Sequence, residues 1–252
     1  MESDAAGAAT ATFALDPLMD VAGHAARYAR HGRVQVPHVL AGDGALRLQR
    51  WLAHEAPWML VFNHGDQLYE LDAAARARLS PQQATDLVRA AHHSARRGFQ
   101  YLYENVRVPD ARVERAATPG LLARFADFLN SPPFLDVARR LVGRDDITFA
   151  DAQATCYREG HFLTTHDDAV PGKNRVAAFV FNFTAEWRAE WGGQLQFVGE
   201  DGAVVEGWVP RFNALNLLRV PQPHLVGCVT PLAGAQAARH SITGWLRTGT
   251  PP

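Results

Sequence analysis

A histidine and two carboxylates lie close together in the tract HFLTTHDDAVPGKNR, residues 161–175. In a β-strand, residues i and i+2 project to the same face, so His166 and Asp168 would share a face that Asp167 does not. A neutral imidazole and a carboxylate are two of the ligands that a transition metal takes in proteins. The tract therefore predicts two ligands of a metal site, and a third must come from elsewhere.

His224 is the best candidate for the third ligand, because it begins an apolar segment directly after the proline-rich tract PQP. Two histidines and one carboxylate on one triangular face, with the opposite positions open, form the facial triad of non-haem Fe(II) oxygenases. The chain contains 11 histidines. A chance His-x-Asp pair that is hydrogen-bonded in a core is therefore the alternative interpretation.

The closing segment RHSITGW predicts an anion site. Arg239 and Ser241 are two residues apart and so face the same way on a strand. A guanidinium with a neighbouring hydroxyl is suited to binding a carboxylate through two parallel hydrogen bonds and a third that orients it. An arginine inside a barrel is costly without such a partner. Otherwise Arg239 would point to solvent or pair with an internal acid.

The residues before Gly143 show mainly helical patterns. Ser80, Pro81 and Gln83 form a capping-box signature, which predicts an amphipathic helix between Ser80 and Asn105. Its buried face would carry Leu87, Ala91, Ala95 and Leu102. Two further helices are predicted, one from Thr118-Pro119 and one from Ser131 to Gly143. Earlier, RVQVPHVL is typical of a strand and GALRLQRWLAHEA of a helix.

The residues after Gly143 form short segments rich in β-branched and aromatic residues, separated by turn signals, as in a sandwich or barrel. The segment VAAFVFNF is apolar on both faces, so we expect the N-terminal helices to cover its outer face. The prediction is an α+β fold. A disordered tail, residues 1–13, precedes a single domain, residues 14–252, with helical support over 14–143 and the main β-structure over 144–252.

The composition and net charge limit the expected binding partners and location of the protein only in part. The 252 residues carry a net charge of −1, which gives no electrostatic footprint for nucleic acid or an anionic membrane. Cys156 and Cys228 are expected to be buried free thiols. The N-terminus has no secretory-signal pattern and no stretch is long enough to span a membrane, so a cytoplasmic location is expected.

Five separated elements occur in an order that resembles a known family. Tyr157, the His166–Asp168 tract, WGGQL at residues 191–195, His224 and RHSITGW together resemble the prolyl 4-hydroxylase branch of the 2-oxoglutarate and Fe(II)-dependent dioxygenases. The tract HDDAVPGKNRVAAFVFNFTAEWRAEWGGQLQF is most similar to the catalytic domain of the ribosomal-protein prolyl hydroxylases and their bacterial relatives. The resemblance implies a double-stranded β-helix, or jelly-roll, with N-terminal helices packed against it.

The resemblance also implies roles for single residues. Fe(II) would bind His166, Asp168 and His224, while Arg239 and Ser241 would hold the far carboxylate of 2-oxoglutarate. Tyr157 matches a tyrosine that lies near this cosubstrate in such enzymes. Asn182 stands where relatives often carry a tyrosine that contacts the far carboxylate, and its shorter amide could donate the same hydrogen bond.

The implied reaction is hydroxylation of an unactivated carbon. It consumes dioxygen and 2-oxoglutarate, releases succinate and carbon dioxide, and takes ascorbate as a supporting reductant. A prolyl residue of a protein or peptide is the expected substrate, and Lys173 and Arg175 are expected at the substrate-facing edge. Two alternatives are a hydroxylase of small molecules with the same chemistry and a barrel that binds metal or ligand without turnover.

Overall fold

The structure is a computed structural model that describes residues 13–65 and 67–251. The predicted N-terminal tail, residues 1–13, lies outside the described residues except for its last residue. Phe13 is buried, and its ring packs edge-on against Phe125 with 5.0 Å between the ring centroids. The described chain therefore begins with a core residue.

In the described residues, all the α-helices lie before Gly143, together with four strands, and the residues after it form strands and two 3-10 turns. The helices are α1 (Val21–His31), α2 (Gly44–His54), α3 (Ala73–Ala77), α4 (Pro81–Ser94), α5 (Arg112–Ala117), α6 (Leu121–Leu129) and α7 (Pro132–Val142), with 3-10 turns at Ala189–Trp191 and Pro231–Ala233. The strands are β1 (Arg33–Val36), β2 (Met59–His64), β3 (Gln67–Leu71), β4 (Tyr101–Arg107), β5 (Ile147–Ala150), β6 (Gln153–Tyr157), β7 (Phe162–His166), β8 (Arg175–Asn182), β9 (Leu195–Val198), β10 (Val204–Trp208), β11 (Ala214–Arg219), β12 (His224–Val226) and β13 (Arg239–Thr248).

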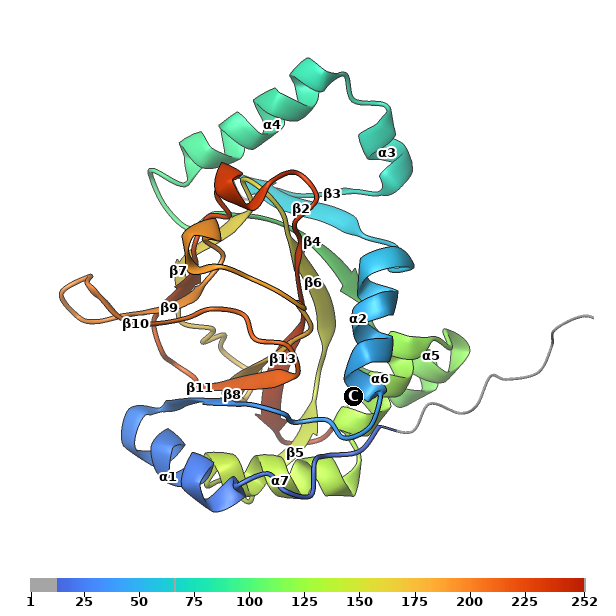
Figure 1. The fold of residues 1–252 in the computed structure, drawn as a ribbon, viewed down its shortest axis with the longest axis vertical. Helices are drawn as coiled ribbons and strands as arrows, with labels where there is room; N and C mark the ends of the chain where they lie inside the picture. Colours follow the sequence, from blue (N-terminus) through green and yellow to red (C-terminus); the bar gives the residue numbers. More distant parts are fainter. Residues whose placement is uncertain (1–12, 66, 252) are drawn as a thin grey trace, which may run out of the picture.

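The strands join in one barrel-like antiparallel sheet. Its path runs β1-β11-β8-β13-β6-β4-β7-β12-β9-β10, with β2 and β3 added beside β4 and β5 beside β13. One wall consists of β11, β8, β13 and β6, and the other of β7, β12, β9 and β10 (Figure 1). Because β4 pairs with both β6 and β7, it connects the two walls. This arrangement is the expected double-stranded β-helix.

Strand β8 shows why the helices lie outside the barrel. Phe179 and Phe181 point into the main hydrophobic core, where Phe181 contacts Phe125 of α6 with 5.2 Å between ring centroids. The alternate residues Ala178 and Val180 line the cavity inside the barrel. The expectation that helices cover the outer face of this strand is therefore confirmed, and α6 and α7 lie on the outside in Figure 1.

Local signals predict two of these helices well. Helix α7 follows Ser131 with proline in its first turn and ends at Gly143, whose φ of 72° is the left-handed conformation that glycine favours. The capping box of α4 is present, because the Ser80 hydroxyl accepts from the Gln83 N–H and the Gln83 side chain accepts from the Ser80 N–H. The starts of both helices can thus be found from sequence.

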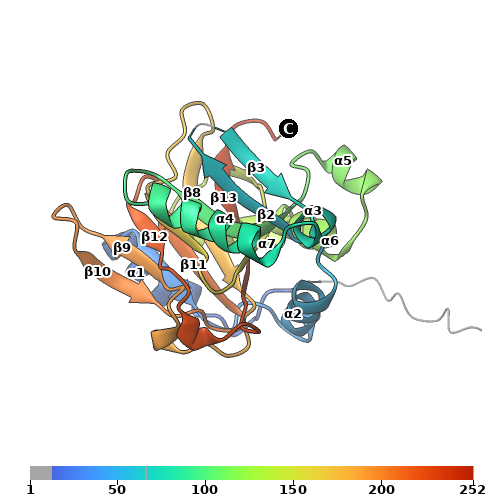
Figure 2. The same ribbon diagram turned by 90° about the horizontal axis from the view of Figure 1, so that it is seen from above.

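The predicted helix between Ser80 and Asn105 is wrong in its second half. Helix α4 ends at Ser94, and residues 101–107 form strand β4. The apolar residues predicted to share one helical face do meet, because Leu87 and Ala91 of α4 pack against Leu102 of β4. These residues meet because α4 packs against both β2 and β4. Figure 2 shows α4 lying over the sheet.

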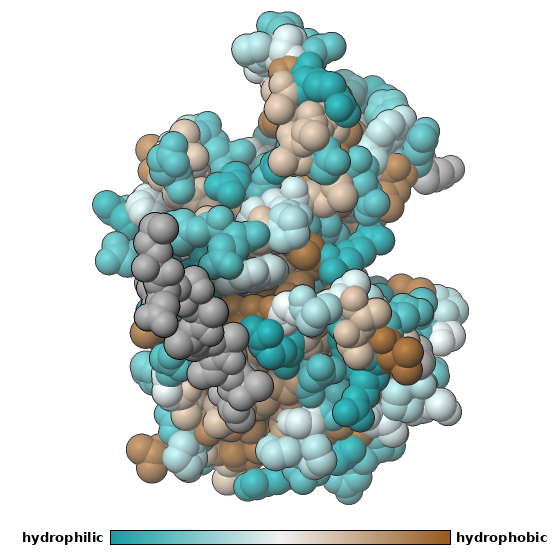
Figure 3. Space-filling view, turned by 90° about the vertical axis from the view of Figure 1, so that its right-hand side faces the viewer, coloured by the Kyte–Doolittle hydropathy of each residue, from teal (hydrophilic) through white to brown (hydrophobic). Residues whose placement is uncertain are grey.

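The N-terminal half is also less helical than predicted, because β1, β2, β3 and β4 all belong to the sheet. The hairpin of β2 and β3 extends the wall beside β4. The face that carries α2, α5 and α6 is largely hydrophilic, with hydrophobic side chains gathered mainly in a central depression (Figure 3). Among the described residues, no helix has the length and apolarity that crossing a membrane requires.

Candidate metal centre and cosubstrate pocket

Two strands far apart in sequence bring the two histidines together. His166 is the last residue of β7 and His224 the first of β12, and the two are direct partners in the antiparallel pair. Their ring centroids lie 4.2 Å apart. Pairing of β7 with β12 therefore places the imidazoles side by side at one end of the cavity.

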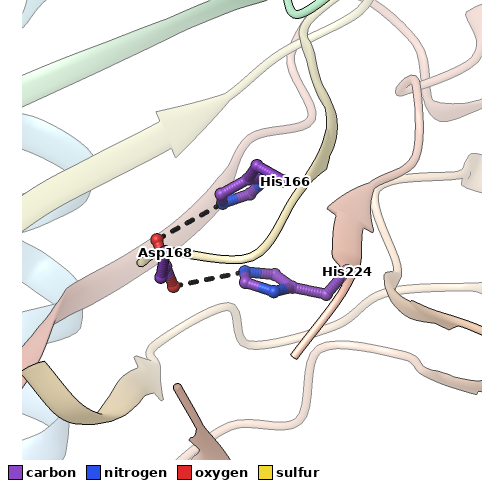
Figure 4. Close-up of side chains that lie close together, drawn as sticks. All are labelled: His166, Asp168 and His224. Atoms are coloured by element: carbon purple, nitrogen blue, oxygen red, sulfur yellow. Dashed lines mark ion pairs between the residues drawn. The ribbon is translucent and has the colours of Figure 1, made fainter. Parts of the chain in front are cut away.

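Asp168 completes the group by leaving the strand. Its φ of 65° is left-handed, a conformation that aspartate tolerates better than most residues. Asp168 Oδ1 lies 3.5 Å from His166 Nε2, and Oδ2 lies 3.4 Å from His224 Nε2 (Figure 4). Strand parity predicted the carboxylate that lies beside both histidines, but its reasoning was wrong, because β7 ends at His166. Asp167 is exposed and accepts a hydrogen bond from the Ala169 N–H.

Backbone carbonyls orient both imidazoles. His166 Nδ1 lies 3.0 Å from the Thr164 carbonyl oxygen, and His224 Nδ1 lies 2.7 Å from that of Gln222. A carbonyl only accepts, so each Nδ1 carries the proton and each Nε2 presents a lone pair toward Asp168. The two rings are thus held in the tautomer that a metal requires.

The charges of the triad suit a divalent metal. Burial would raise the pKa of Asp168, but the neighbouring His166 and His224 hold it below its ordinary value. Burial and the neighbouring His166 lower the pKa of His224. A carboxylate and neutral imidazoles are the forms that bind metal. The ligand atoms of the three residues all lie within 4.8 Å of one another, and no second such group occurs in residues 13–65 and 67–251.

The triad lies in a cavity of about 260 Å³ that also contains the predicted anion site. Arg239 is only 2% exposed, and its guanidinium carbon lies 5.0 Å from the centre of the Tyr157 ring, its neighbour on β6. Throughout the described part of the chain, the Arg239 side chain finds no carboxylate and no hydrogen-bond partner, and its Nε is buried. A buried guanidinium facing a cavity without an internal acid fits the bound carboxylate of 2-oxoglutarate.

Ser241 lines the same cavity and Asn182 does not. Ser241 Oγ lies 2.8 Å from the Thr155 hydroxyl, which the sequence analysis missed. The Asn182 amide is fully buried and donates weakly to the carbonyls of Val180 and Ala214, at 3.4 Å each. The structure therefore gives the predicted cosubstrate contact of Asn182 no support, and Thr155 has the better position.

Aromatic residues form one wall of the cavity, and sequence reasoning missed them because it predicted a helix there. Phe99, Tyr101 and Tyr103 line it, and Tyr103 stacks on Tyr157 with 5.3 Å between centroids. Burial raises the pKa of Tyr103 to about 12. Phe99 is 54% exposed and lies at the mouth, 5.9 Å from the His166 ring. The Tyr-x-Tyr alternation was the available signal for a strand.

The WGGQL turn has a packing role. Gly192 has a φ of 73°, and a Cβ there would lie 2.0 Å from the carbonyl oxygen of Cys228. Gly193 donates its N–H to the Gly227 carbonyl, so the turn brings the segment before β9 against the end of β12. Cys228 is exposed, contrary to prediction, whereas Cys156 is buried.

The predicted substrate-facing edge needs correction at Arg175. Lys173 is exposed, but Arg175 Nη1 donates to the Asp168 carbonyl at 2.9 Å. The guanidinium carbon of Arg175 also lies 3.4 Å from the centre of the Trp245 ring. This side chain is therefore engaged within the protein and is not free for a substrate.

Comparison with known proteins agrees with the geometry. Residues 152–247 match the family described as the 2OG-Fe(II) oxygenase superfamily. No curated protein matches the chain.

Several solved structures share the fold. A prolyl-4-hydroxylase from Pseudomonas putida is 17% identical, with a TM-score of 0.56 over 91% of this chain and 100% of that one. A prolyl hydroxylase from Trichoplax adhaerens, in complex with a hypoxia inducible factor peptide fragment, is 17% identical, with a TM-score of 0.54 over 89% and 87%. The 2-oxoglutarate-dependent epimerase SnoN, from nogalamycin biosynthesis, is 15% identical, with a TM-score of 0.54 over 89% and 81%.

The family match and the His166–Asp168–His224 group support the same assignment. The matched segment contains all three residues together with Tyr157, Arg239 and Ser241. Residues 152–247 therefore match this oxygenase family and hold a candidate iron triad, and the match implies Fe(II) and 2-oxoglutarate as cofactors.

Proposed function

We propose that this oxygenase hydroxylates an unactivated carbon, with a prolyl residue of a protein or peptide as the substrate. The observation that carries the proposal is the shared cavity of the triad and the unpaired Arg239. A barrel that only bound metal would have no need of a buried cation there, so the arrangement argues against a binding module without turnover.

His166, Asp168 and His224 would hold Fe(II) through two Nε2 atoms and one carboxylate. When bound, Fe(II) and 2-oxoglutarate supply the activation of dioxygen, coupled to decarboxylation of the cosubstrate to succinate and carbon dioxide. Arg239 would bind the far carboxylate, and the hydroxyl pair of Thr155 and Ser241 would orient it. These residues thereby exclude water from the charged end of the cavity.

The open aromatic mouth supports a substrate with an apolar ring. Phe99 is half exposed beside His166, and Tyr101 lies next to it with 5.7 Å between ring centroids. A pyrrolidine ring could pack against these faces while its peptide stays outside. Similarity in fold to the two prolyl hydroxylases is consistent with such a substrate, and a ribosomal-protein target rests on sequence resemblance alone.

A small molecule is the second candidate substrate. The cavity wall is apolar and aromatic, which would equally suit a free apolar compound, and the fold is also that of the epimerase SnoN. Peptide and small-molecule panels with detection of a one-oxygen gain in mass separate the two candidates.

The decisive experiment is anaerobic addition of Fe(II) and 2-oxoglutarate, followed by oxygen and a succinate assay. We expect a weak visible charge-transfer band and then succinate. His166→Ala should abolish both signals, whereas Asp167→Ala should keep them, because Asp167 is exposed and its carboxylate accepts from the Ala169 N–H outside the triad. Absence of the band in the native chain, or equal loss in both variants, would contradict the proposal.

A further inference from the structure

The loop of residues 167–174 between β7 and β8 carries the carboxylate of the triad, yet the sheet does not hold that residue. β7 ends at His166, and Asp168 then adopts a left-handed backbone conformation. The direction of its carboxylate depends on this backbone turn, because the side chain has only two rotatable bonds. Something outside the ladder of strand hydrogen bonds must therefore keep the turn in place.

Arg175, the first residue of β8, contacts this turn from the far end of the loop. Its Nη1 donates to the carbonyl oxygen of Asp168 at 2.9 Å. Its planar guanidinium lies 3.4 Å above the centre of the Trp245 ring, a stacking that only arginine among the cationic residues makes well. In the described residues Arg175 makes no ion pair within 4.0 Å, so this carbonyl and this ring account for its placement.

We infer that Arg175 is a positioning residue that fixes Asp168 in the geometry of a metal ligand, with Trp245 as the platform on which Arg175 rests. The inference rests on the proposed function, because it requires that the triad binds metal. Trp245 lies on β13 and lines the same cavity, so the platform belongs to the rigid wall of the barrel. Residues behind the ligands of a metal site typically change its affinity strongly when they are removed.

Arg247 of β13 provides a matched control, because it contacts the same loop. Its Nε donates to the Lys173 carbonyl at 2.8 Å, near the other end of the loop. Its guanidinium carbon also lies over an aromatic ring, 4.7 Å from the centre of Phe149, and it pairs with Asp151 at 3.3 Å. Arg247 thus has the same chemistry and the same kind of anchor, but it touches none of the three candidate ligands.

The test is titration of the metal-free protein with Mn(II), followed by electron paramagnetic resonance, which needs no turnover. Arg175→Met should weaken Mn(II) binding roughly 10- to 100-fold, the usual effect of losing a group behind a metal ligand. Loss of a nearby positive charge would by itself tighten binding of a cation. The expected sign therefore separates positioning from simple electrostatics. Arg247→Met should leave the dissociation constant within about twofold, as for a group that touches no ligand.

Arg175→Lys keeps the charge and a donor but loses the planar stacking, so its dissociation constant should fall between those of the native protein and Arg175→Met. This variant also decides the matter if Arg175→Met does not fold. Unchanged or tighter binding in the Arg175 variants, or equal weakening in Arg247→Met, would overturn the inference. A native protein that binds no Mn(II) would instead contradict the proposed function.

Discussion

Two buried charges lie on opposite faces of the same sheet, on strands that both pair with β6. Glu104 of β4 and Arg239 of β13 are each 2% exposed. Glu104 faces outward, where Arg158 lies 2.9 Å away and Arg76 also pairs with it. Arg239 faces inward beside Tyr157 and has no counterpart among the residues the structure describes.

The difference separates a structural cluster from a ligand site. A buried ion is stable when other charges and hydrogen bonds compensate its lost hydration. Burial would raise the pKa of Glu104, but Arg158 and Arg76 hold it below its ordinary value. Burial instead lowers the pKa of Arg239, because no acid compensates it. The outer charge is compensated within the protein, whereas the inner one is not, which is what a site for a bound anion would require.

The largest expected effect comes from removing the outer charge. Glu104→Gln should lower the free energy of unfolding by about 3 to 5 kcal/mol, because it leaves two arginines without their carboxylate. Urea denaturation measures this loss. The folded variant should bind 2-oxoglutarate like the native protein. A change in that affinity together with unchanged stability would reverse the roles of the two faces.

Removal of the inner charge should weaken ligand binding without lowering the stability of the protein. Arg239→Met should weaken 2-oxoglutarate binding by about 2 to 3 kcal/mol, or roughly 30- to 150-fold, since hydrogen bonds to a charged carboxylate are lost. Calorimetric titration in the presence of Mn(II) gives the dissociation constant. Stability without ligand should stay equal or rise, because an uncompensated charge is removed. A large loss of stability would show that Arg239 is paired within the protein.

The outer face should also make stability depend on pH. Burial lowers the pKa of His161 and of His240 to about 4, and both lie near Glu104 and Arg158. The unfolded chain, with ordinary histidine values, then binds more protons between pH 6.5 and 4, so stability falls as the pH falls through this range. At pH 5.5 each histidine should lower the free energy of unfolding by about 1 kcal/mol relative to pH 7. His161→Gln should make the free energy of unfolding depend less on pH, which denaturation at pH 7 and at pH 5.5 measures. An unchanged difference between the two pH values would contradict this prediction.

The smallest effect concerns the hydroxyl pair in the cavity. Thr155→Val should weaken 2-oxoglutarate binding by about 1 kcal/mol, because Ser241 loses the partner that orients its hydroxyl. Cys156→Ala changes the next position, which faces outward, and should leave that affinity unaltered. A greater effect of Cys156→Ala than of Thr155→Val on the affinity for 2-oxoglutarate would contradict the separation of the inner and outer faces of β6.

Much of the site could be predicted from short stretches of sequence. The starts of α4 and α7 follow from capping residues and prolines, and the outward phenylalanines of β8 follow from its apolar pattern. The spacing of Arg239 and Ser241 was sufficient to place both on one face of a strand. The identity of the three candidate ligands also came from residue type and order, because few side chains suit an iron site.

The long-range features were decided by the tertiary structure. Leu87, Ala91 and Leu102 have helical spacing, yet they meet because α4 crosses β4, and periodicity cannot distinguish these cases. His224 faces His166 only through the pairing of β12 with β7. The left-handed turn of Asp168 is held by Arg175, which lies beyond the loop. Local periodicity and capping act within one segment, whereas pairing partners and the uncompensated charge of Arg239 depend on which distant segments pack together.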